Sequence, residues 1–471
     1  MGKNNALRLF ALGILIILVA PTLVQKGMFM DGLQYAIVGK NLSEGLGTFW
    51  YPHLSATWYK AGSTYFMEHP PLAYFLQSLY FDLLGDSMYT ERIYSFSICL
   101  LTAYLIHLIW RQIFKAAHQL RPLSWLPILL WIMTPIVFWT YPNNVQETTL
   151  GLFDLLSILM VVKAHDADRI NYKYVILAGI ALVAALLTKG VQGLFPLTAF
   201  ILLGLTLGGK YWISQAVIRT TIITASAITV FAIVSLSAEA RDSLSFYINE
   251  RLLNRISSEP VVSNRLYSVR KLILEILPMA GLSILTYAIA RYFKSKLATD
   301  YTYGKWATFF LLVGFSASLP LTLTSIQRPF YLAPSIPYFA LSLAVCIAPF
   351  TLTLTSRINT KILTGLAAVT LILSIVLTTN NLGKVGRDKD ELYDVSILGE
   401  HIEKNITIGV SKAVYNNWSF QFYLLREYNI SMKIGDTTAP YFLSDLNPKS
   451  GIEAKFKRKN IKLKQHVLFQ K

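Results

Sequence analysis

Long apolar runs recur along most of this chain, and they limit what it can fold into more than any other feature. Residues 7–24 form one such run, and a helix needs roughly 20 mainly apolar residues to cross a hydrocarbon core about 30 Å thick. The chain is 54% hydrophobic and only 15% charged, and its apolar residues lie in continuous stretches rather than in amphipathic alternation. The sequence therefore predicts an all-α membrane protein that crosses the bilayer many times.

Eleven membrane spans are predicted from windows of about 19 residues. They cover residues 7–25, 91–112, 123–141, 147–163, 173–188, 191–208, 214–237, 272–290, 306–325, 329–350 and 361–379. No small-residue cleavage site follows the first run before Pro21. We therefore expect this run to be a retained span and not a signal peptide.

Lysines and arginines gather in every second short loop between these spans. They include Arg111, Lys115, Arg121, Lys163, Lys173, Arg291, Lys305, Arg357 and Lys361. Because short cytoplasmic loops carry an excess of these residues, we expect a cytoplasmic N-terminus, a C-terminal tail outside, and a location in the cell (inner) membrane. This topology explains the net charge of +17. No nucleic-acid-binding motif accompanies the charge, so we expect no nucleic-acid partner.

The tail differs in composition from the rest of the chain. It is polar from about residue 380 and alternates helix-like stretches at 390–403 and 418–428 with strand-like ones at 407–410 and 430–433. We therefore predict two domains. A membrane domain covers residues 1–379, with outer-face loops at 26–90 and 238–271, and a small extracytoplasmic α/β domain covers residues 380–471.

The loop at 26–90 is too long for a passive connection and contains Asp31, Tyr35, Glu68 and His69. Asp31 follows the first span, where a carboxylate can act as general base for a hydroxyl or bind a cation. It could equally be the N-cap of a helix over residues 32–41. Glu68 and His69 could bind phosphate or a divalent metal ion, or be solvated surface. Two adjacent ligands are too few to define a metal site.

Three cations, Arg92, Lys189 and Arg328, lie at the outer ends of predicted spans. Lys189 lies between two apolar runs with almost no loop, where a cation is costly. It either snorkels to the membrane interface or belongs to an anion site. The arginines present a planar fork that matches phosphate oxygens.

Further polar groups are expected on the same outer face. Asn144 and Glu147 lie at the entrance of the span at 147–163, where Glu147 could simply be a carboxylate favoured by the helix dipole. Several arginines, Arg251 among them, occur in the loop at 238–271. They could bind an anion or pair with nearby acids such as Glu250.

Five short motifs follow one another along the membrane part of the chain. They are Asp31-Gly32-Leu33-Gln34-Tyr35-Ala36, Glu68-His69-Pro70-Pro71-Leu72, Glu91-Arg92, Leu187-Thr188-Lys189-Gly190 and Arg328-Pro329-Phe330-Tyr331-Leu332-Ala333-Pro334. Their order and spacing resemble the GT-C superfamily of polyprenyl-phosphate-sugar-dependent glycosyltransferases. Within it, the chain is similar to the protein O-mannosyltransferase and lipid A aminoarabinose transferase group, families 39 and 83.

The resemblance implies a GT-C fold and an inverting transfer of a hexosyl or pentosyl group to lipid A, a protein or another cell-envelope glycan. The donor would be a polyprenyl-phosphate sugar such as an undecaprenyl phosphate derivative, with no certain cofactor and a divalent metal left open. Asp31 would be the catalytic carboxylate, acting as base on the acceptor or orienting it. Lys189, Arg328, Arg92 and His69 would bind the donor phosphate, and Tyr35, Glu68, Asn144, Glu147 and Tyr331 would support the site.

This sequence departs from the family pattern at three places. Gly32 stands where a second acid is common, and His69 replaces a phosphate-binding lysine. Glu147 and Asn144 compete for the position of an acid near the fourth span. The rival interpretation is a transporter or flippase of a lipid-linked saccharide. Such proteins tend to carry ionisable residues in mid-span and on both faces, whereas here the polar groups favour one face.

Overall fold

The computed structural model of the 471-residue chain describes residues 1–57, 64–165, 170–208, 212–254, 262, 264–293, 301–446 and 455–471. Contacts divide the chain into two compact units. The helical unit consists of Met1–Leu23, Glu68–Pro70 and Ser95–Asn381, and the loop–tail unit of Val24–Met67, Pro71–Tyr94 and Leu382–Lys471. Part of the predicted loop at 238–271 lies outside the described residues.

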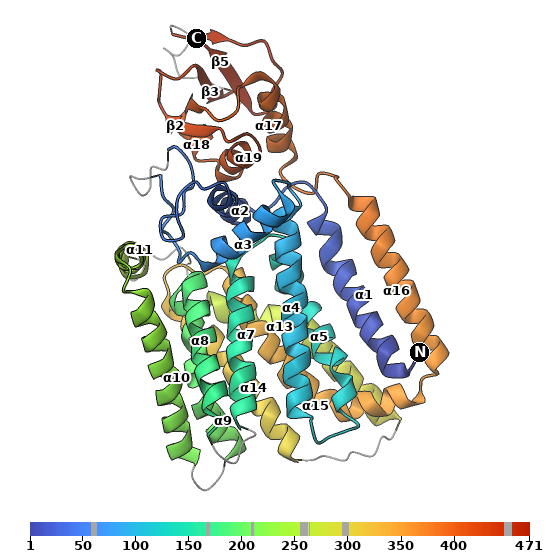
Figure 1. Ribbon diagram of the computed structural model, residues 1–471. Coiled ribbons are helices and arrows are strands. Elements are labelled where there is room, and N and C mark those ends of the chain that lie inside the picture. Colours follow the sequence, from blue (N-terminus) through green and yellow to red (C-terminus); the bar gives the residue numbers. More distant parts are fainter. Residues whose placement is uncertain are drawn as a thin grey trace. The chain divides into compact units, whose positions relative to one another are not determined.

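Long helices dominate the helical unit (Figure 1). They are α1 (Lys3–Leu23), α4 (Thr90–Ile113), α7 (Gln146–His165), α8 (Tyr172–Lys189), α10 (Trp212–Val234), α13 (Tyr267–Tyr292), α14 (Tyr301–Ser318), α15 (Ile336–Arg357) and α16 (Thr360–Asn381). Within the described ranges, nine helical segments are long and apolar enough to cross a membrane. The prediction of an all-α polytopic membrane protein is confirmed.

Two of the eleven predicted spans are not among these nine segments, because their helices are short and interrupted. The span at 123–141 consists of η2 (Arg121–Leu123), α5 (Trp125–Ile132) and α6 (Pro135–Thr140). It breaks at Thr134, which is extended because it precedes Pro135. The span at 191–208 begins as the 3-10 segment η3 (Val191–Thr198), which contains Pro196, and continues as α9 (Ala199–Leu207). Apolar composition alone does not reveal such breaks.

Small residues bring the helices close together. Gly13 of α1 faces Thr370 of α16, and a side chain at Gly13 would overlap the threonine hydroxyl. Close approach at small residues is typical of helix association in membranes. Lipid tails are as apolar as the helix surfaces, so close packing rather than the hydrophobic effect brings the helices together. α1 and α16 therefore lie side by side, although they come from opposite ends of the unit's sequence (Figure 1).

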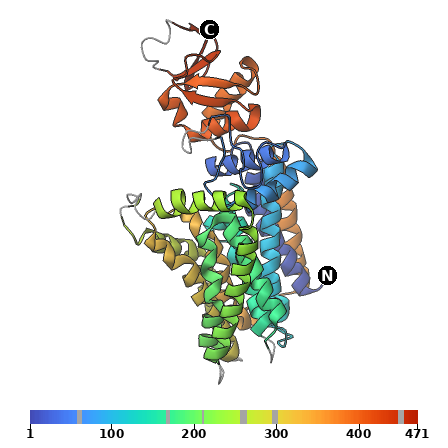
Figure 2. The same cartoon turned by 60° about the vertical axis from the view of Figure 1, so that its left-hand side comes forward.

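Short segments cover one end of the long helices. α11 (Ala238–Phe246) and the π-helical turn η4 (Tyr247–Leu253) run across the bundle rather than along it (Figure 2). The 3-10 segments η5 (Leu319–Leu323) and η6 (Pro329–Ser335) contact α14, and η6 also packs against α7. These irregular segments surround the pocket described below.

The loop–tail unit combines the first predicted loop with the C-terminal tail. The loop contributes α2 (Met30–Ser43) and α3 (Leu72–Leu84). The tail contributes α17 (Lys389–His401), α18 (Lys412–Tyr415), α19 (Trp418–Tyr428) and a five-stranded sheet in the order β2-β1-β3-β5-β4. These strands are β1 (Thr407–Val410), β2 (Ser431–Ile434), β3 (Tyr441–Asp445), β4 (Lys457–Arg458) and β5 (His466–Gln470). The prediction of an α/β tail is confirmed.

The sheet is mixed. β1 pairs in parallel with β2 and β3, while β5 runs antiparallel to β3 and β4. One hydrophobic core joins α2 to this domain, because Leu33, Ile37 and Val38 of α2 pack in the same cluster as Tyr423 and Leu424 of α19. The helix that carries Asp31 therefore belongs to the same rigid core as the tail.

Candidate functional site

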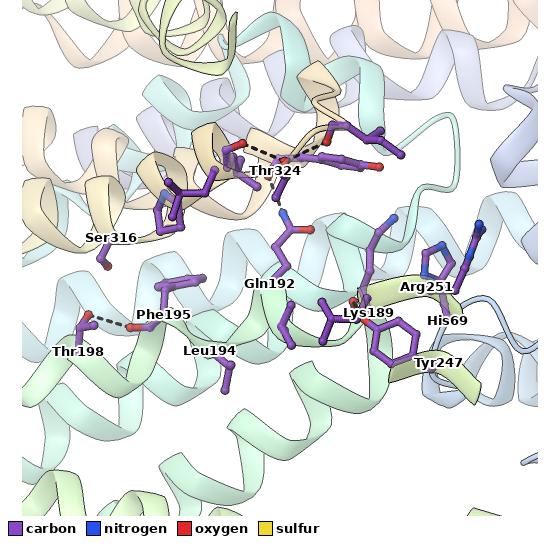
Figure 3. A pocket seen from close by; sticks show the side chains of 18 residues that line it. His69, Lys189, Gln192, Leu194, Phe195, Thr198, Tyr247, Arg251, Ser316 and Thr324 are labelled. Carbon is purple, nitrogen blue, oxygen red and sulfur yellow. Dashed lines mark hydrogen bonds between the residues drawn. The ribbon is translucent and has the colours of Figure 1, made fainter. Parts of the chain in front are cut away.

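A pocket of about 500 Å³ lies among η3, η4, η5 and η6 of the helical unit. Figure 3 shows His69, Lys189, Tyr247 and Arg251 gathered toward one end, with Thr198, Phe195 and Ser316 toward the other. Apolar side chains form much of the remaining wall: Val191, Leu194, Leu252, Ala317, Pro320, Leu321, Leu323 and Ile326. A cationic end followed by apolar walls suits an amphiphile with an anionic head group.

Lys189, the last residue of α8, supplies one cation of this pocket. Its Nζ lies 2.7 Å from Oε1 of Glu147 in the first turn of α7. Glu147 is 0% exposed and Lys189 is 8% exposed, so the snorkelling alternative is not what the structure contains. The ammonium group also lies 5.5 Å from the ring centroid of Tyr331. An ammonium has three donors, so pairing with one carboxylate is compatible with binding a further anion.

Gly190 explains why this lysine ends its helix where it does. It is the C-cap of α8 and has a φ of +79°, a left-handed conformation that glycine adopts without steric cost. The hydroxyl of Tyr247 donates to the Lys189 carbonyl at 3.4 Å, and a side chain at position 190 would overlap this hydroxyl. Glycine therefore allows η4 to approach Lys189 closely.

His69 of the Glu68-His69 motif lies at the same end of the pocket as Lys189 (Figure 3). Glu68 forms an ion pair with Arg251 of η4, and His69 and Arg251 both line the pocket. The alternative in which Glu68 is simply solvated surface is wrong. Arg251 therefore pairs with Glu68, an acid about 180 positions away in sequence.

The Arg328-to-Pro334 motif contributes in two ways. Tyr331 of η6 lines the pocket, and its carbonyl accepts a hydrogen bond of 2.7 Å from Nε2 of Gln192. Arg328 is the N-cap of η6, with an extended backbone and an exposed side chain. It does not line the pocket itself.

Glu147 and Asn144 have different environments. Asn144 is buried and has a left-handed φ of 49° two residues before α7, which fits the tolerance of asparagine for this conformation. Glu147 lies in the first turn of α7 and forms the ion pair with Lys189. Glu147 is thus the carboxylate that faces Lys189 at this end of α7.

Asp31, Tyr35 and Arg92 belong to the loop–tail unit. Asp31 is half-buried in the first turn of α2, which begins at Met30 with Phe29 as its N-cap, so the alternative in which Asp31 is the N-cap is wrong. Tyr35 lies in the hydrophobic core with its ring 5.9 Å from that of Tyr74. Arg92 is buried and donates a hydrogen bond of 2.7 Å to the carbonyl of Gly27.

Glu68 and His69 are the two residues for which the sequence leaves a divalent metal ion open. In the described part of the chain, no group of three or more His, Cys, Asp or Glu side chains is placed to hold a metal ion. The Glu68 carboxylate is engaged by Arg251.

Sequence reasoning did not single out Gln192, Tyr247 or Arg251 as site residues. Gln192 and Tyr247 carry no charge, and no signal in the sequence places the η4 turn beside α8. Arg251 was one of several arginines in its loop. The π-helical geometry of η4 is a local irregularity of the kind that is frequent at functional sites, but it becomes visible only in the structure.

Comparisons with known proteins identify the fold of this chain. Residues 68–236 match the family described as dolichyl-phosphate-mannose-protein mannosyltransferase. ArnT from Cupriavidus metallidurans bound to undecaprenyl phosphate superposes with a TM-score of 0.68 at 14% identity, covering 98% of this chain and 97% of that one. The chain has a GT-C fold of the ArnT type. The apo state of the same ArnT gives a TM-score of 0.65 at 13% identity, covering 98% of this chain and 97% of that one. No curated protein sequence matches the chain.

The GT-C fold predicted from the five motifs is thus confirmed. The segment that matches the mannosyltransferase family contains Glu68, His69, Asn144, Glu147 and Lys189. Asp31, Arg328 and Tyr331 lie outside it. The residues brought together around Lys189 therefore come mostly from the matched segment, and η4 and η6 complete the pocket from beyond it.

Proposed function

We propose that this chain is a glycosyltransferase that moves a sugar from a polyprenyl-phosphate donor to an acceptor hydroxyl. The observation that carries this proposal is the pocket, whose cationic end holds Lys189 and Arg251 and whose walls are apolar. A lipid phosphate has the same division between an anionic head and a hydrocarbon chain. The likeness to an ArnT structure that holds undecaprenyl phosphate supports the same class of donor.

The cations of the pocket would stabilise the lipid phosphate as it leaves. When the bond between the anomeric carbon and the phosphate oxygen breaks, the oxygen keeps the electron pair and negative charge accumulates on the lipid phosphate. Lys189, Arg251 and His69 line the pocket at one end, where they can offset this charge. Preorganised charge stabilisation of this kind is usually the largest catalytic contribution.

Asp31 is assigned the catalytic role from the resemblance to the GT-C group. Its carboxylate would accept the proton of the acceptor hydroxyl, whose oxygen forms the new bond to the anomeric carbon from the side opposite the phosphate. This displacement inverts the anomeric configuration. The acceptor would be lipid A, a protein or another envelope glycan.

The membrane orientation belongs to the same proposal. The basic loops predict a cytoplasmic N-terminus in the cell membrane, which puts Lys189, Glu147, Arg328 and the tail on the outer side. Transfer would then occur on the outer face, where a translocated lipid-linked sugar is available.

The proposal is tested with the purified full chain in liposomes, given undecaprenyl-phosphate sugars labelled in the sugar together with a membrane extract. We expect label to move into the extract, and Asp31→Asn to lower the rate by about a hundredfold or more, the range for loss of a general base. Asp82→Asn, which alters an exposed aspartate of α3, is the matched control.

Two outcomes would contradict different parts of the proposal. Label that stays wholly on the polyprenyl carrier with folded wild-type protein would favour a transporter or flippase. Full transfer by Asp31→Asn would leave the glycosyltransferase intact but remove the role of Asp31.

A further inference from the structure

A tyrosine of the tail is bonded to the backbone just before the helix that carries Asp31. Tyr423 projects from α19, and its hydroxyl accepts a hydrogen bond of 2.8 Å from the N–H of Met28. The same hydroxyl lies 2.8 Å from Oδ2 of Asp388 and 3.0 Å from the Met28 carbonyl, to either of which it can donate. Both Tyr423 and Met28 are buried. Met28 is three residues before Asp31.

The segment that leads into α2 is also paired with the tail along its backbone. Gly383 N–H donates to the Val24 carbonyl, Lys26 N–H to the Lys384 carbonyl and Gly386 N–H to the Lys26 carbonyl, at 3.0, 2.8 and 3.0 Å. Arg92 braces the next residue through the Gly27 carbonyl. The path of residues 24–28 is therefore set by the tail before α2 begins.

The same tail helix is linked to the other end of α2 by charge. Arg426, one turn beyond Tyr423 on α19, lies 2.7 Å from Asp86, which in turn lies 2.7 Å from Lys40 near the end of α2. Arg426 also pairs with Glu91 at 3.0 Å. α19 thus holds α2 at both ends, and their side chains share one hydrophobic core.

Of these contacts, the hydrogen bond between Tyr423 and Met28 is the one that lies nearest to Asp31. It can also be removed without changing the packing of the core. A phenylalanine at position 423 would fill the same core volume, so the hydroxyl adds hydrogen bonds and little else. Catalytic groups lose much of their rate advantage when they are misplaced by about 1 Å. A bond three residues from a catalytic carboxylate is well placed to prevent such a shift.

We propose that Tyr423 is a positioning residue of the tail domain, which fixes the first turn of α2 and thereby the Asp31 carboxylate. This inference rests on the proposed function of Asp31. The tail domain is then part of the catalytic apparatus, and not only an accessory module for acceptors.

The test compares Tyr423→Phe with wild type in the full chain reconstituted in nanodiscs. Turnover is measured with the undecaprenyl-phosphate sugar that wild type transfers, and binding with undecaprenyl phosphate alone. We expect kcat to fall by roughly three- to tenfold, while KM for the donor and the Kd of undecaprenyl phosphate stay unchanged. The melting temperature should fall slightly, because the buried N–H of Met28 loses its acceptor. Tyr428→Phe, on the same helix, should match wild type in all four.

A second variant guards against a folding defect. Asp388→Asn leaves Tyr423 in the core but removes the carboxylate that orients its hydroxyl, and we expect a smaller loss of kcat in the same direction. Wild-type kcat in Tyr423→Phe would overturn the inference. Weaker lipid binding in both variants would also overturn it, because it would mean general structural damage. Wild-type protein that transfers no sugar would contradict the proposed function instead.

Discussion

At the scale of single residues, Lys189 combines a structural and a proposed functional role. It neutralises Glu147, which is completely buried, and it lines the cationic end of the pocket. Removing one partner of a buried ion pair leaves an uncompensated charge, which costs about 3–5 kcal/mol. A single substitution at Lys189 therefore cannot separate the two roles.

A double substitution can separate the structural role of Lys189 from its proposed role in binding phosphate. We predict that Lys189→Met lowers both the melting temperature and the affinity for undecaprenyl phosphate. Adding Glu147→Gln removes the stranded carboxylate, so Lys189→Met/Glu147→Gln should regain most of the melting temperature but not the affinity. Thermal unfolding and lipid binding of the full chain measure the two effects, with undecaprenol as the lipid control without phosphate. Recovery of wild-type affinity in the double variant would exclude Lys189 as a phosphate ligand.

At the scale of elements, the end of α8 depends on Gly190. Gly190→Ala places a side chain on a backbone with φ +79° and ψ −146°, a region close to one that only glycine commonly adopts, which costs about 1–3 kcal/mol, and also displaces Tyr247. We predict a lower melting temperature and weaker binding of undecaprenyl phosphate, because η4 carries both Tyr247 and Arg251 into the pocket.

Gly208→Ala is the matched control. Gly208 is the C-cap of α9 with a φ of +74°, and no described atom lies within 4 Å of an added Cβ. This variant shares the backbone strain but not the collision. If both variants weaken lipid binding equally, the contact between Tyr247 and the end of α8 does not shape the pocket.

The helices and strands also show how much of the fold could be predicted from the sequence. Hydrophobic runs located the long helices, and composition identified the α/β tail, with α19 at the predicted 418–428 and β1 at 407–410. His69 and Lys189, two of the residues predicted to bind the donor phosphate, both line the pocket. The 3-10 and π-helical segments could not be predicted, because hydropathy carries no information on local backbone geometry. Neither could the pairs Glu68–Arg251 and Glu147–Lys189, since they join distant positions.

At the scale of the whole molecule, the loop–tail unit is assembled from three separate stretches of chain. Its core joins the loop helix α2 to the tail. A contact deep in the tail domain can therefore influence the stability of the whole unit. Asp394 of α17 makes such a contact: it is buried, lies 2.8 Å from the His466 ring and accepts hydrogen bonds from two backbone N–H groups.

This contact predicts a loss of stability in acid. Burial alone would raise the pKa of Asp394, but the hydrogen bonds from His466 and from the backbone at Lys464 and Gln465 hold it below the ordinary value of 3.8. A carboxyl group with a lowered pKa in the folded state stabilises that state above the ordinary value, and this contribution is lost as pH falls through the folded pKa. The melting temperature of the unit should therefore decrease when the pH falls below about 4 to 5.

Asp394→Asn should be less stable than wild type at neutral pH and should lose less stability on acidification. Amide hydrogen exchange at α17 and α19 of the full chain can follow this unfolding. Asp390→Asn is the control, because Asp390 lies on the same helix in an exposed pair with Lys464, and exposed pairs contribute little. An acid dependence in Asp394→Asn as steep as that of wild type would mean that other groups govern the acid lability of the unit that carries Asp31.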